Sequence, residues 1–340
     1  MKKKLLVLAV GAALVAPLAQ ADGPEVYGKI NLSLEHMKYD PAPGAPANDD
    51  EWELQSNASR FGIRGDFDLD VAGLKALYQA EFEIAVDDGD NKGDTLSQRN
   101  IFAGLQGAFG TLRAGRFDTP TKEAQGKIDQ FNDLDGDMKH IASGEVRASN
   151  IIAYTSPKLG GLVTFNAAFI PAEDQDDFDG DGSNENGLAD STSVSLVLAR
   201  NGFYGALAHD SDIQDELLVD ATGTSPTLDI TRAVAGLKMD RFELGALFEN
   251  ARESEGDGEE NSYLVSGAYK IDRVKLKAQY GHVKGDQTDN EGVQYALGLD
   301  YALAKNAKVY GYYNNLKYEF DNGSPDDKTQ TIGVGMELKF

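Results

Sequence analysis

Charged residues in the first half of the chain form two groups that could act together on a charged or dipolar solute. The acidic group lies in residues 118–146, where seven acids outnumber three bases. Its candidate members are Asp118, Glu123, Asp129, Asp133, Asp135 and Asp137. The basic group lies on strand-like stretches around this segment and comprises Arg60, Arg64, Lys75, Arg113, Arg116 and Arg147. Facing rows of opposite charge create a field that selects and orients solutes without converting them chemically.

Residues suited to enzymatic chemistry are sparse. The chain has no cysteine, which excludes a Cys nucleophile, a thiolate metal site and a disulfide framework. None of the four histidines, His36, His140, His209 and His282, accompanies a serine in a G-x-S-x-G motif. A net charge of −24 argues against nucleic-acid binding, because few bases are left to neutralise phosphates. We therefore expect a protein that is not an enzyme and has no cofactor.

One acidic motif invites a metal-site interpretation. The stretch Asp177-Phe178-Asp179-Gly180-Asp181-Gly182 matches the start of a calcium-binding loop. However, its twelfth position is Leu188 rather than glutamate, and no helical pattern flanks it. We expect a solvated acidic loop here, and a weak loop-ordering Ca²⁺ site at Asp177, Asp179 and Asp181 is the alternative.

The charged groups need elements that hold them in rows, and the chain predicts β-strands for this purpose. In residues 329–340 the apolar side chains share one parity, and small, polar or charged ones share the other. The apolar row consists of Ile332, Val334, Met336, Leu338 and Phe340. About sixteen such patterns follow one another from residues 25–36 to residues 329–340, and short turns alternate with longer polar loops. This asymmetry is typical of transmembrane β-barrels.

A membrane location fits the rest of the sequence. Residues 1–21 combine three lysines, an apolar stretch and Ala19-Gln20-Ala21, which together predict a cleaved signal peptide and a domain of residues 22–340. Removing the three lysines changes the net charge from −24 to −27. Beyond residue 21 no run of about 18 apolar residues predicts a transmembrane helix, but a barrel strand needs only about 9–11 residues. The alternative is a periplasmic β-sandwich or propeller, although no repeat of 40–50 residues supports a propeller.

Strand parity predicts which bases face inward. Regular alternation directs Arg60, Arg64, Lys75, Arg113 and Arg147 to the polar face. Arg116 has the outward parity but lies at a loop junction, where the pattern can break. Arg99 also has the outward parity, so we expect it to contact a loop or another subunit.

Several short motifs, in order along the mature chain, resemble those of Gram-negative general diffusion porins. They are Ser59-Arg60-Phe61-Gly62-Ile63-Arg64-Gly65, Ala72-Gly73-Leu74-Lys75-Ala76, Phe109-Gly110-Thr111-Leu112, Gly115-Arg116 and Tyr154-Thr155-Ser156-Pro157. The resemblance implies an all-β, sixteen-stranded antiparallel transmembrane barrel, usually a homotrimer, in the outer membrane. It also implies that a loop of about residues 118–146 folds inward to form a constriction opposite a basic wall. The final Phe340 resembles the signal that such proteins present to the barrel-assembly machinery.

The expected function is a water-filled channel for passive diffusion of ions and small hydrophilic solutes. The net charge of −27 and the excess of four acids in residues 118–146 predict mild cation preference. An arginine wall could reverse this preference, because charges beyond about 8–10 Å are largely screened. A channel specific for an anion or amino acid, and a structural or adhesive barrel, are the alternatives. The acidic exterior could contact lipopolysaccharide through divalent cations, and residues 89–96 lie where relatives contact a neighbouring subunit.

Overall fold

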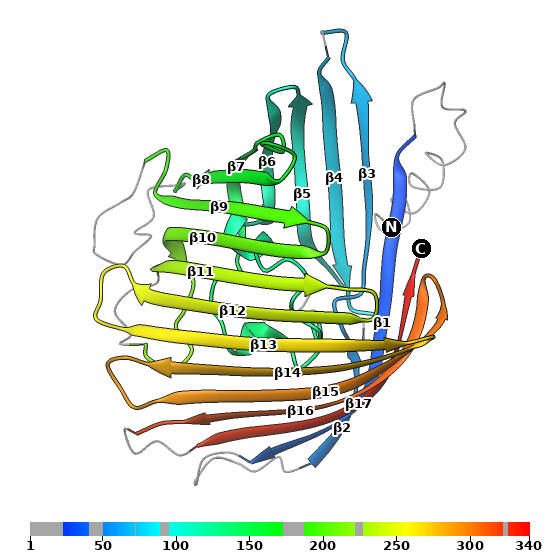
Figure 1. Ribbon diagram of the computed structural model, residues 1–340, viewed down its shortest axis with the longest axis vertical. Coiled ribbons are helices and arrows are strands. Elements are labelled where there is room, and N and C mark those ends of the chain that lie inside the picture. The colour runs from blue at the N-terminus through cyan, green and yellow to red at the C-terminus, as the bar shows by residue number, and fades with distance from the viewer. Residues whose placement is uncertain are drawn as a thin grey trace, which may run out of the picture.

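The strands form one closed antiparallel barrel (Figure 1). The computed structural model describes residues 23–40, 50–71, 73–88, 95–172, 187–221, 227–321 and 326–340. Its strand segments are β1 (Glu25–Asp40), β2 (Asp50–Ser56), β3 (Arg60–Asp68), β4 (Lys75–Ile84), β5 (Leu96–Gly107), β6 (Gly110–Asp118), β7 (Arg147–Thr155), β8 (Val163–Ile170), β9 (Ser191–Arg200), β10 (Phe203–Gln214), β11 (Thr227–Lys238), β12 (Phe242–Glu253), β13 (Glu259–Ile271), β14 (Val274–Gly285), β15 (Glu291–Ala304), β16 (Ala307–Glu319) and β17 (Asp327–Lys339). The barrel closes because β1 pairs with β17 on one edge and with β2 and β3 on the other.

A β-bulge separates β2 from β3, and the two segments are halves of one strand. Both pair with β1, where Lys29 lies opposite Arg60 and Leu32 lies opposite Ser56. Two residues of β1 thus face three on the other strand, and Ala58 in the bulge has a φ of 48°. With these halves joined, the described residues form sixteen strands, which confirms the predicted number. The β2 half was not expected from the sequence pattern.

Side chains alternate between the two surfaces of the barrel along most strands. In β17, Ile332 and Val334 are 58% and 59% exposed on the outer surface, whereas Thr331 is fully buried on the lumen side. The outer surface therefore carries the apolar band that lipid contact requires, and the predicted parity of this strand is confirmed. No helix among the described residues is long and apolar enough to span a membrane.

Aromatic side chains on the outer surface lie at two levels. Phe242 and Tyr269 pair with ring centroids 4.6 Å apart at the ends of β12 and β13. Phe248 and Tyr263 pair at 5.2 Å, six residues farther along the same two strands. At about 3.3 Å per residue, six residues span about 20 Å. Because barrel strands are tilted by about 35–45°, the two levels are about 15 Å apart along the barrel axis, within the height of an apolar band of about 25 Å.

Short turns and long loops alternate around the barrel. Asn201 and Gly202 join β9 to β10 and have positive φ angles of 49° and 85°, as a two-residue type I′ turn requires. The next connection, from β10 to β11, runs from residue 215 to residue 226. We call the two ends of the barrel the short-turn end and the long-loop end. The alternation predicted from the sequence is confirmed.

The connection between β6 and β7, residues 119–146, lies inside the barrel, and we call it the inner loop. It contains the short helices α2 (Pro120–Glu123) and η1 (Met138–His140). Gln279 of β14 accepts a hydrogen bond from the backbone of Gln130 (3.0 Å), and Asn314 of β16 donates one to the carbonyl of Asp135 (3.0 Å). In Figure 1 the inner loop is seen behind the strands β10 to β14. One edge of the inner loop contacts the barrel wall from β9 through β17 to β1. The opposite edge of the loop therefore faces strands β2–β7.

Buried apolar side chains attach the inner loop to the barrel wall. Phe131, Met138 and Ile141 are fully buried. Phe131 packs with Ala296 and Tyr310, on β15 and β16. Burying each of the three large side chains stabilises the docked loop by roughly 1.5–3 kcal/mol relative to a water-filled lumen.

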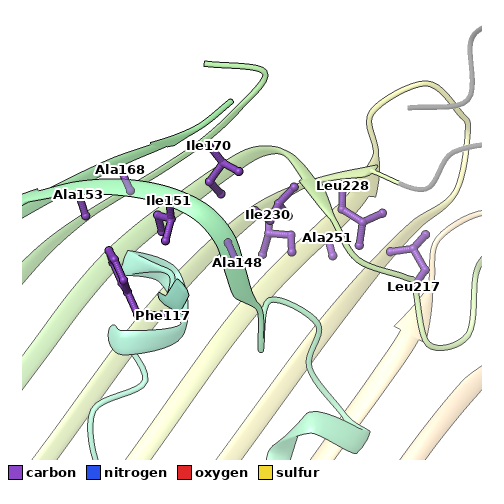
Figure 2. Close-up of a cluster of buried hydrophobic side chains, with 11 residues drawn as sticks. Phe117, Ala148, Ile151, Ala153, Ala168, Ile170, Leu217, Leu228, Ile230 and Ala251 are labelled. Carbon is purple, nitrogen blue, oxygen red and sulfur yellow. The ribbon is translucent and has the colours of Figure 1, made fainter. Parts of the chain in front are cut away.

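The lumen surface is not polar throughout. An apolar cluster joins the root of the inner loop to strands across the barrel (Figure 2). Phe117 lies next to the last residue of β6, Ile151 comes from β7, Ile170 from β8 and Ile230 from β11. Parity alone does not indicate this cluster, because a lumen residue becomes apolar only where another segment covers it.

Candidate functional site

A cavity of about 490 Å³ separates the free edge of the inner loop from strands β2 to β7. Its lining contains five basic and seven acidic side chains. The basic ones are Arg60, Arg99, Lys122, Lys139 and Arg147, and the acidic ones are Glu81, Glu83, Asp118, Asp133, Asp135, Asp137 and Glu145. This is where the barrel lumen is narrowed by the loop, and its lining is charged on both sides.

The three arginines on the wall side of the cavity, Arg60, Arg99 and Arg147, each lie within ion-pair distance of a wall carboxylate. Arg99 Nε donates to Glu81 Oε1 at 3.1 Å, and its Nη1 also bonds Glu83. Arg147 Nε lies 3.0 Å from Asp118 Oδ1. The wall is therefore an alternation of positive and negative groups, and not the purely basic row that the sequence analysis expected.

Arg99 faces the lumen, which corrects the outward orientation expected from parity. The pairing of β4 with β5 shifts register between Ala80 and Phe82. Ala80 lies opposite Ile101 and Phe82 lies opposite Gln98, so one residue of β4 faces two residues of β5. The resulting bulge inserts an extra residue in β5 and reverses the alternation at Arg99. A one-residue change of register turns every following side chain to the other face.

Asp133 forms the bridge between the inner loop and the wall. Lys29 Nζ of β1 donates to Asp133 Oδ2 at 2.5 Å, and Arg60 Nη1 lies 3.5 Å from the same oxygen. Burial acts to raise the pKa of Asp133, but the charges of Lys29 and Arg60 outweigh it and hold the pKa below 3.8. Asp133 has a φ of 67°, a left-handed conformation that aspartate tolerates better than most residues.

Asp135 and Asp137 also line the cavity, but among the described residues neither forms a salt bridge. Thr331 Oγ1 donates to Asp135 Oδ2 at 2.5 Å. Asp137 accepts hydrogen bonds from the backbone amides of Asp133 (2.8 Å) and Lys139 (2.9 Å). Neither carboxylate at the edge of the cavity is therefore paired with a base among the described residues.

Asp129 shapes the inner loop instead of lining the cavity. Its two oxygens accept hydrogen bonds from the backbone amides of Phe131 (2.7 Å) and Met138 (3.0 Å). Burial, reinforced by the charge of Asp137, raises the pKa of Asp129 to about 8. The predicted role of Asp129 as a lining acid does not match this position, since the carboxyl is turned into the loop.

Four other predicted site residues lie outside the cavity. Glu123, in α2 of the inner loop, receives a hydrogen bond from Arg113 Nη2 (3.2 Å). Arg64 pairs with Glu25 at 2.8 Å, and Lys75 pairs with Asp66 at 2.9 Å, both toward the short-turn end. Parity predicts which face a side chain occupies but not its depth in the barrel, and this explains the difference.

Arg116 is likewise absent from the cavity lining. Its Nη1 donates to Ser149 Oγ at 2.6 Å. The register of β6 against β7 shifts between Gly115 and Phe117, so the pattern does break at this junction, as its position by the inner loop suggested. Of the six predicted basic residues, only Arg60 and Arg147 line the cavity.

The acidic wall residues Glu81 and Glu83 were missed by sequence reasoning, as was Lys29. A usable signal existed, because the alternation of β4 places both glutamates on the lumen face. Considering acids and bases together on the inward parity would have found them. The pairing of Lys29 with Asp133 had no local signal, because the two residues are 104 positions apart.

A single buried guanidinium fastens both ends of the inner loop to the wall opposite the cavity. Arg232 of β11 is fully buried. It donates to the carbonyl of Thr121 (3.2 Å) at the start of the loop and to that of Ser143 (2.5 Å) near its end. It also pairs with Glu249 of β12 (2.5 Å) and with Glu145 of the loop (2.8 Å). This arrangement holds the loop against β11 and β12, so the opening stays on the β2–β7 side.

Some predictions concern segments outside the described residues. They are the signal peptide of residues 1–21, the weak calcium site at Asp177, Asp179 and Asp181, and residues 89–94 of the expected subunit-contact segment.

Comparisons with known proteins agree with the fold. Residues 6–322 match the family described as Gram-negative porin. The major outer membrane protein P.IB of Neisseria sicca is 25% identical over all of both chains, and that of a Neisseria meningitidis serogroup B strain is 26% identical over all of both chains. An anion-selective porin from Comamonas acidovorans has the same fold, with a TM-score of 0.75 and 22% identity over 94% of this chain and 99% of that chain. This chain therefore belongs to the Gram-negative porin family and is a channel-forming β-barrel of the outer membrane.

Proposed function

We propose that the cavity is the constriction of a water-filled channel through which ions and small hydrophilic solutes diffuse passively, with a mild preference for cations. The observation that supports the cation preference is the seven-to-five excess of acids over bases in the cavity lining. Charges at a constriction govern selectivity because they lie within a Debye length of every passing ion, about 8 Å at physiological ionic strength.

The pairing of the wall arginines strengthens this proposal. Glu81, Glu83 and Asp118 each lie within ion-pair distance of Arg99 or Arg147. An arginine paired in this way attracts a passing anion weakly, since the partner carboxylate repels it. Asp135 and Asp137, which have no such partner among the described residues, are left as the attractive groups for cations.

A planar-bilayer recording across a salt gradient tests the proposal. Stepwise conductance establishes the pore, and the sign of the reversal potential reports selectivity. We expect the cation sign for the wild type. The double variant Glu81→Gln/Glu83→Gln leaves five acids and five bases in the lining, so its reversal potential should move toward the anion side.

The matched control removes two acids elsewhere. Asp66→Asn/Asp68→Asn changes the net charge equally at the short-turn end, where both side chains are largely exposed, and should barely move the reversal potential. An anion-selective wild type would refute the cation preference. Equal shifts in the two double variants would show that the cavity charges do not govern selectivity.

A channel tuned to amino-acid-like solutes is the second candidate. It is favoured by the presence of guanidinium and carboxylate groups on facing sides of one cavity, such as Arg147 on the wall and Asp135 on the loop. Liposome swelling with a zwitterion and with a neutral solute of equal size distinguishes the candidates. Faster swelling with the zwitterion supports tuning, and equal rates support a general channel.

We further propose a homotrimer in contact with outer-membrane lipid and lipopolysaccharide, assembled through recognition of the strand that ends in Phe340. Support comes from a structural neighbour with a TM-score of 0.65, the trimer form of OmpT of Vibrio cholerae. An unboiled detergent gel should show a heat-labile species of three times the monomer mass. A single monomer-sized species would contradict the trimer.

A further inference from the structure

The charged residues of the barrel are segregated along its axis. At the long-loop end, the described residues contain 22 acids and four bases in residues 38–40, 50–53, 85–88, 187–190, 215–221, 253–260, 284–291, 317–321 and 326–328. At the short-turn end they contain nine acids and 13 bases in residues 23–25, 64–71, 73–75, 106–113, 156–163, 200–203, 238–243, 270–275, 300–308 and 337–340. The two mouths of the channel therefore carry opposite net charge, strongly negative at one and weakly positive at the other.

Two acids at the long-loop end, Glu260 and Asp220, are held in place by backbone amides and have no salt bridge among the described residues. Glu260 accepts hydrogen bonds from the backbone amides of Leu218 (2.9 Å) and Val219 (3.0 Å), and so fixes residues 215–221 across the lumen side of the mouth. Asp220 accepts in the same way from the amide of Gln287 (2.9 Å). Because backbone amides carry no net charge, these contacts fix the carboxyl groups in position without pairing them with a base.

At the short-turn end the charges form compact ion pairs with a surplus of bases. Glu243 is shared by Lys238 (2.9 Å) and Lys275 (2.7 Å), and Asp300 is shared by Lys277 (3.2 Å) and Lys308 (3.1 Å). Each of these two acids thus lies between two bases, and the short-turn end as a whole has 13 bases and nine acids. The narrow cavity lies between the two ends, so ions reaching it are supplied from mouths of opposite charge.

We propose that this axial asymmetry makes the channel an ionic rectifier, which passes more current when the long-loop side is electrically positive. This proposal rests on the proposed channel function. Under that polarity cations enter through the mouth that enriches them, and anions enter from the end that does not repel them. Both therefore accumulate in the constriction and its conductance rises. Under the opposite polarity each ion must enter through the less favourable end, and the constriction is depleted.

The test is a single-channel current–voltage curve in 0.1 M KCl, read from the instantaneous current before any voltage-induced closure. We expect the current with the long-loop side positive to exceed the opposite current by roughly 1.5-fold to 3-fold, given mouth potentials of several kT. At 1 M salt, where the Debye length is about 3 Å, the ratio should approach one.

Orientation in the bilayer is assigned with one introduced thiol. The natural chain has no cysteine, so Gln287→Cys provides a unique reactive site at the long-loop end. The side chain of Gln287 is exposed, and its contact with Asp220 uses the backbone amide, which the substitution keeps. A membrane-impermeant thiol reagent that is too large to pass the cavity, such as a polymer carrying a maleimide, changes the current only if it is added to the compartment that contains the long loops.

Two matched quadruple variants test the cause. Neutralising four exposed acids of the long-loop mouth should lower the ratio toward one, and neutralising four acids of the short-turn end should keep or raise it. The first variant is Glu255→Gln/Asp257→Asn/Asp286→Asn/Asp289→Asn, and the second is Asp66→Asn/Asp68→Asn/Asp240→Asn/Asp272→Asn.

The outcomes separate the two proposals. A symmetric curve at 0.1 M, or a larger current of the opposite polarity, overturns rectification while leaving the channel intact. Equal effects of the two quadruple variants overturn the axial charge as its cause. Absence of conductance from folded, heat-modifiable protein overturns the channel function on which the inference rests.

Discussion

Arg232→Gln is the substitution that most directly tests how the inner loop keeps its position. The guanidinium is fully buried and contacts the loop at Thr121, Ser143 and Glu145, as well as the wall at Glu249. Glutamine is shorter and uncharged, so it cannot replace both ion pairs. The variant leaves the fully buried Glu249 without a cation partner among the described residues, and it leaves Glu145 with only the more distant Lys122 (3.9 Å).

The expected magnitude follows from that burial. Removing one partner of a buried ion pair costs roughly 3–5 kcal/mol, because the remaining charge is left unpaired. At about 1.4 kcal/mol for each factor of ten, the undocked loop becomes roughly a hundred-fold to several thousand-fold more populated. The apolar anchors Phe131, Met138 and Ile141 remain, so the loop should detach transiently and not permanently.

The pH dependence of this variant has a defined sign. Burial raises the pKa of Glu145, and Arg232 opposes that rise. Without Arg232 the pKa of Glu145 increases further, so the docked loop holds a proton that the detached, solvated loop would lose. Docking is then favoured at low pH and weakens as pH rises through this pKa. Detachment in Arg232→Gln should therefore increase on going from pH 5 to pH 8.

Two assays read the detachment. Trypsin cleavage after Lys122, Lys127 or Lys139 reports exposure of the loop, and current noise in the open channel reports its motion. Arg241→Gln is the matched control, because Arg241 is 61% exposed at a short turn and lies 3.8 Å from Asp240. If Arg232→Gln resembles this control in both assays, the guanidinium does not hold the loop and the reasoning is refuted.

Three further perturbations have clear expected outcomes. Asp129→Asn removes a carboxyl whose pKa rises from 3.8 to about 8 on folding. Between these two values the folded chain binds a proton that the unfolded chain does not, so the stability of the wild type falls as pH rises. The variant should therefore flatten this part of a plot of melting temperature against pH. In Gly28→Val the new Cβ would lie 2.4 Å from the ring of Phe340 and 2.8 Å from a backbone carbonyl. The yield of heat-modifiable barrel should therefore fall. An unchanged yield would contradict close packing at the closing strand. Lys29→Met leaves Asp133 paired only with the more distant Arg60. The single-channel current should become noisier and the channel more cation-selective. An unchanged reversal potential would show that Arg60 already neutralises Asp133.

The local pattern of the sequence determined the barrel. Strand existence, the outward row from Ile332 to Phe340 and the alternation of short turns with long loops all follow from side chains that repeat every two residues and from turn residues such as Asn201-Gly202. These features depend on neighbours in the chain, so they can be predicted without knowing which strands meet. The position of the inner loop between β6 and β7 was predictable only through resemblance to a known family.

Tertiary structure decided which charges meet. A bulge in β5 turned Arg99 into the lumen against its parity, and the position of Arg64 and Lys75 along their strands took them away from the cavity. The contacts that hold the loop join residues far apart in sequence, such as Arg232 and Thr121, 111 positions apart. Such pairs depend on strand register and on the path of a loop across the lumen. A period of two specifies the face of a side chain, but its depth and its partner are set only when the barrel closes.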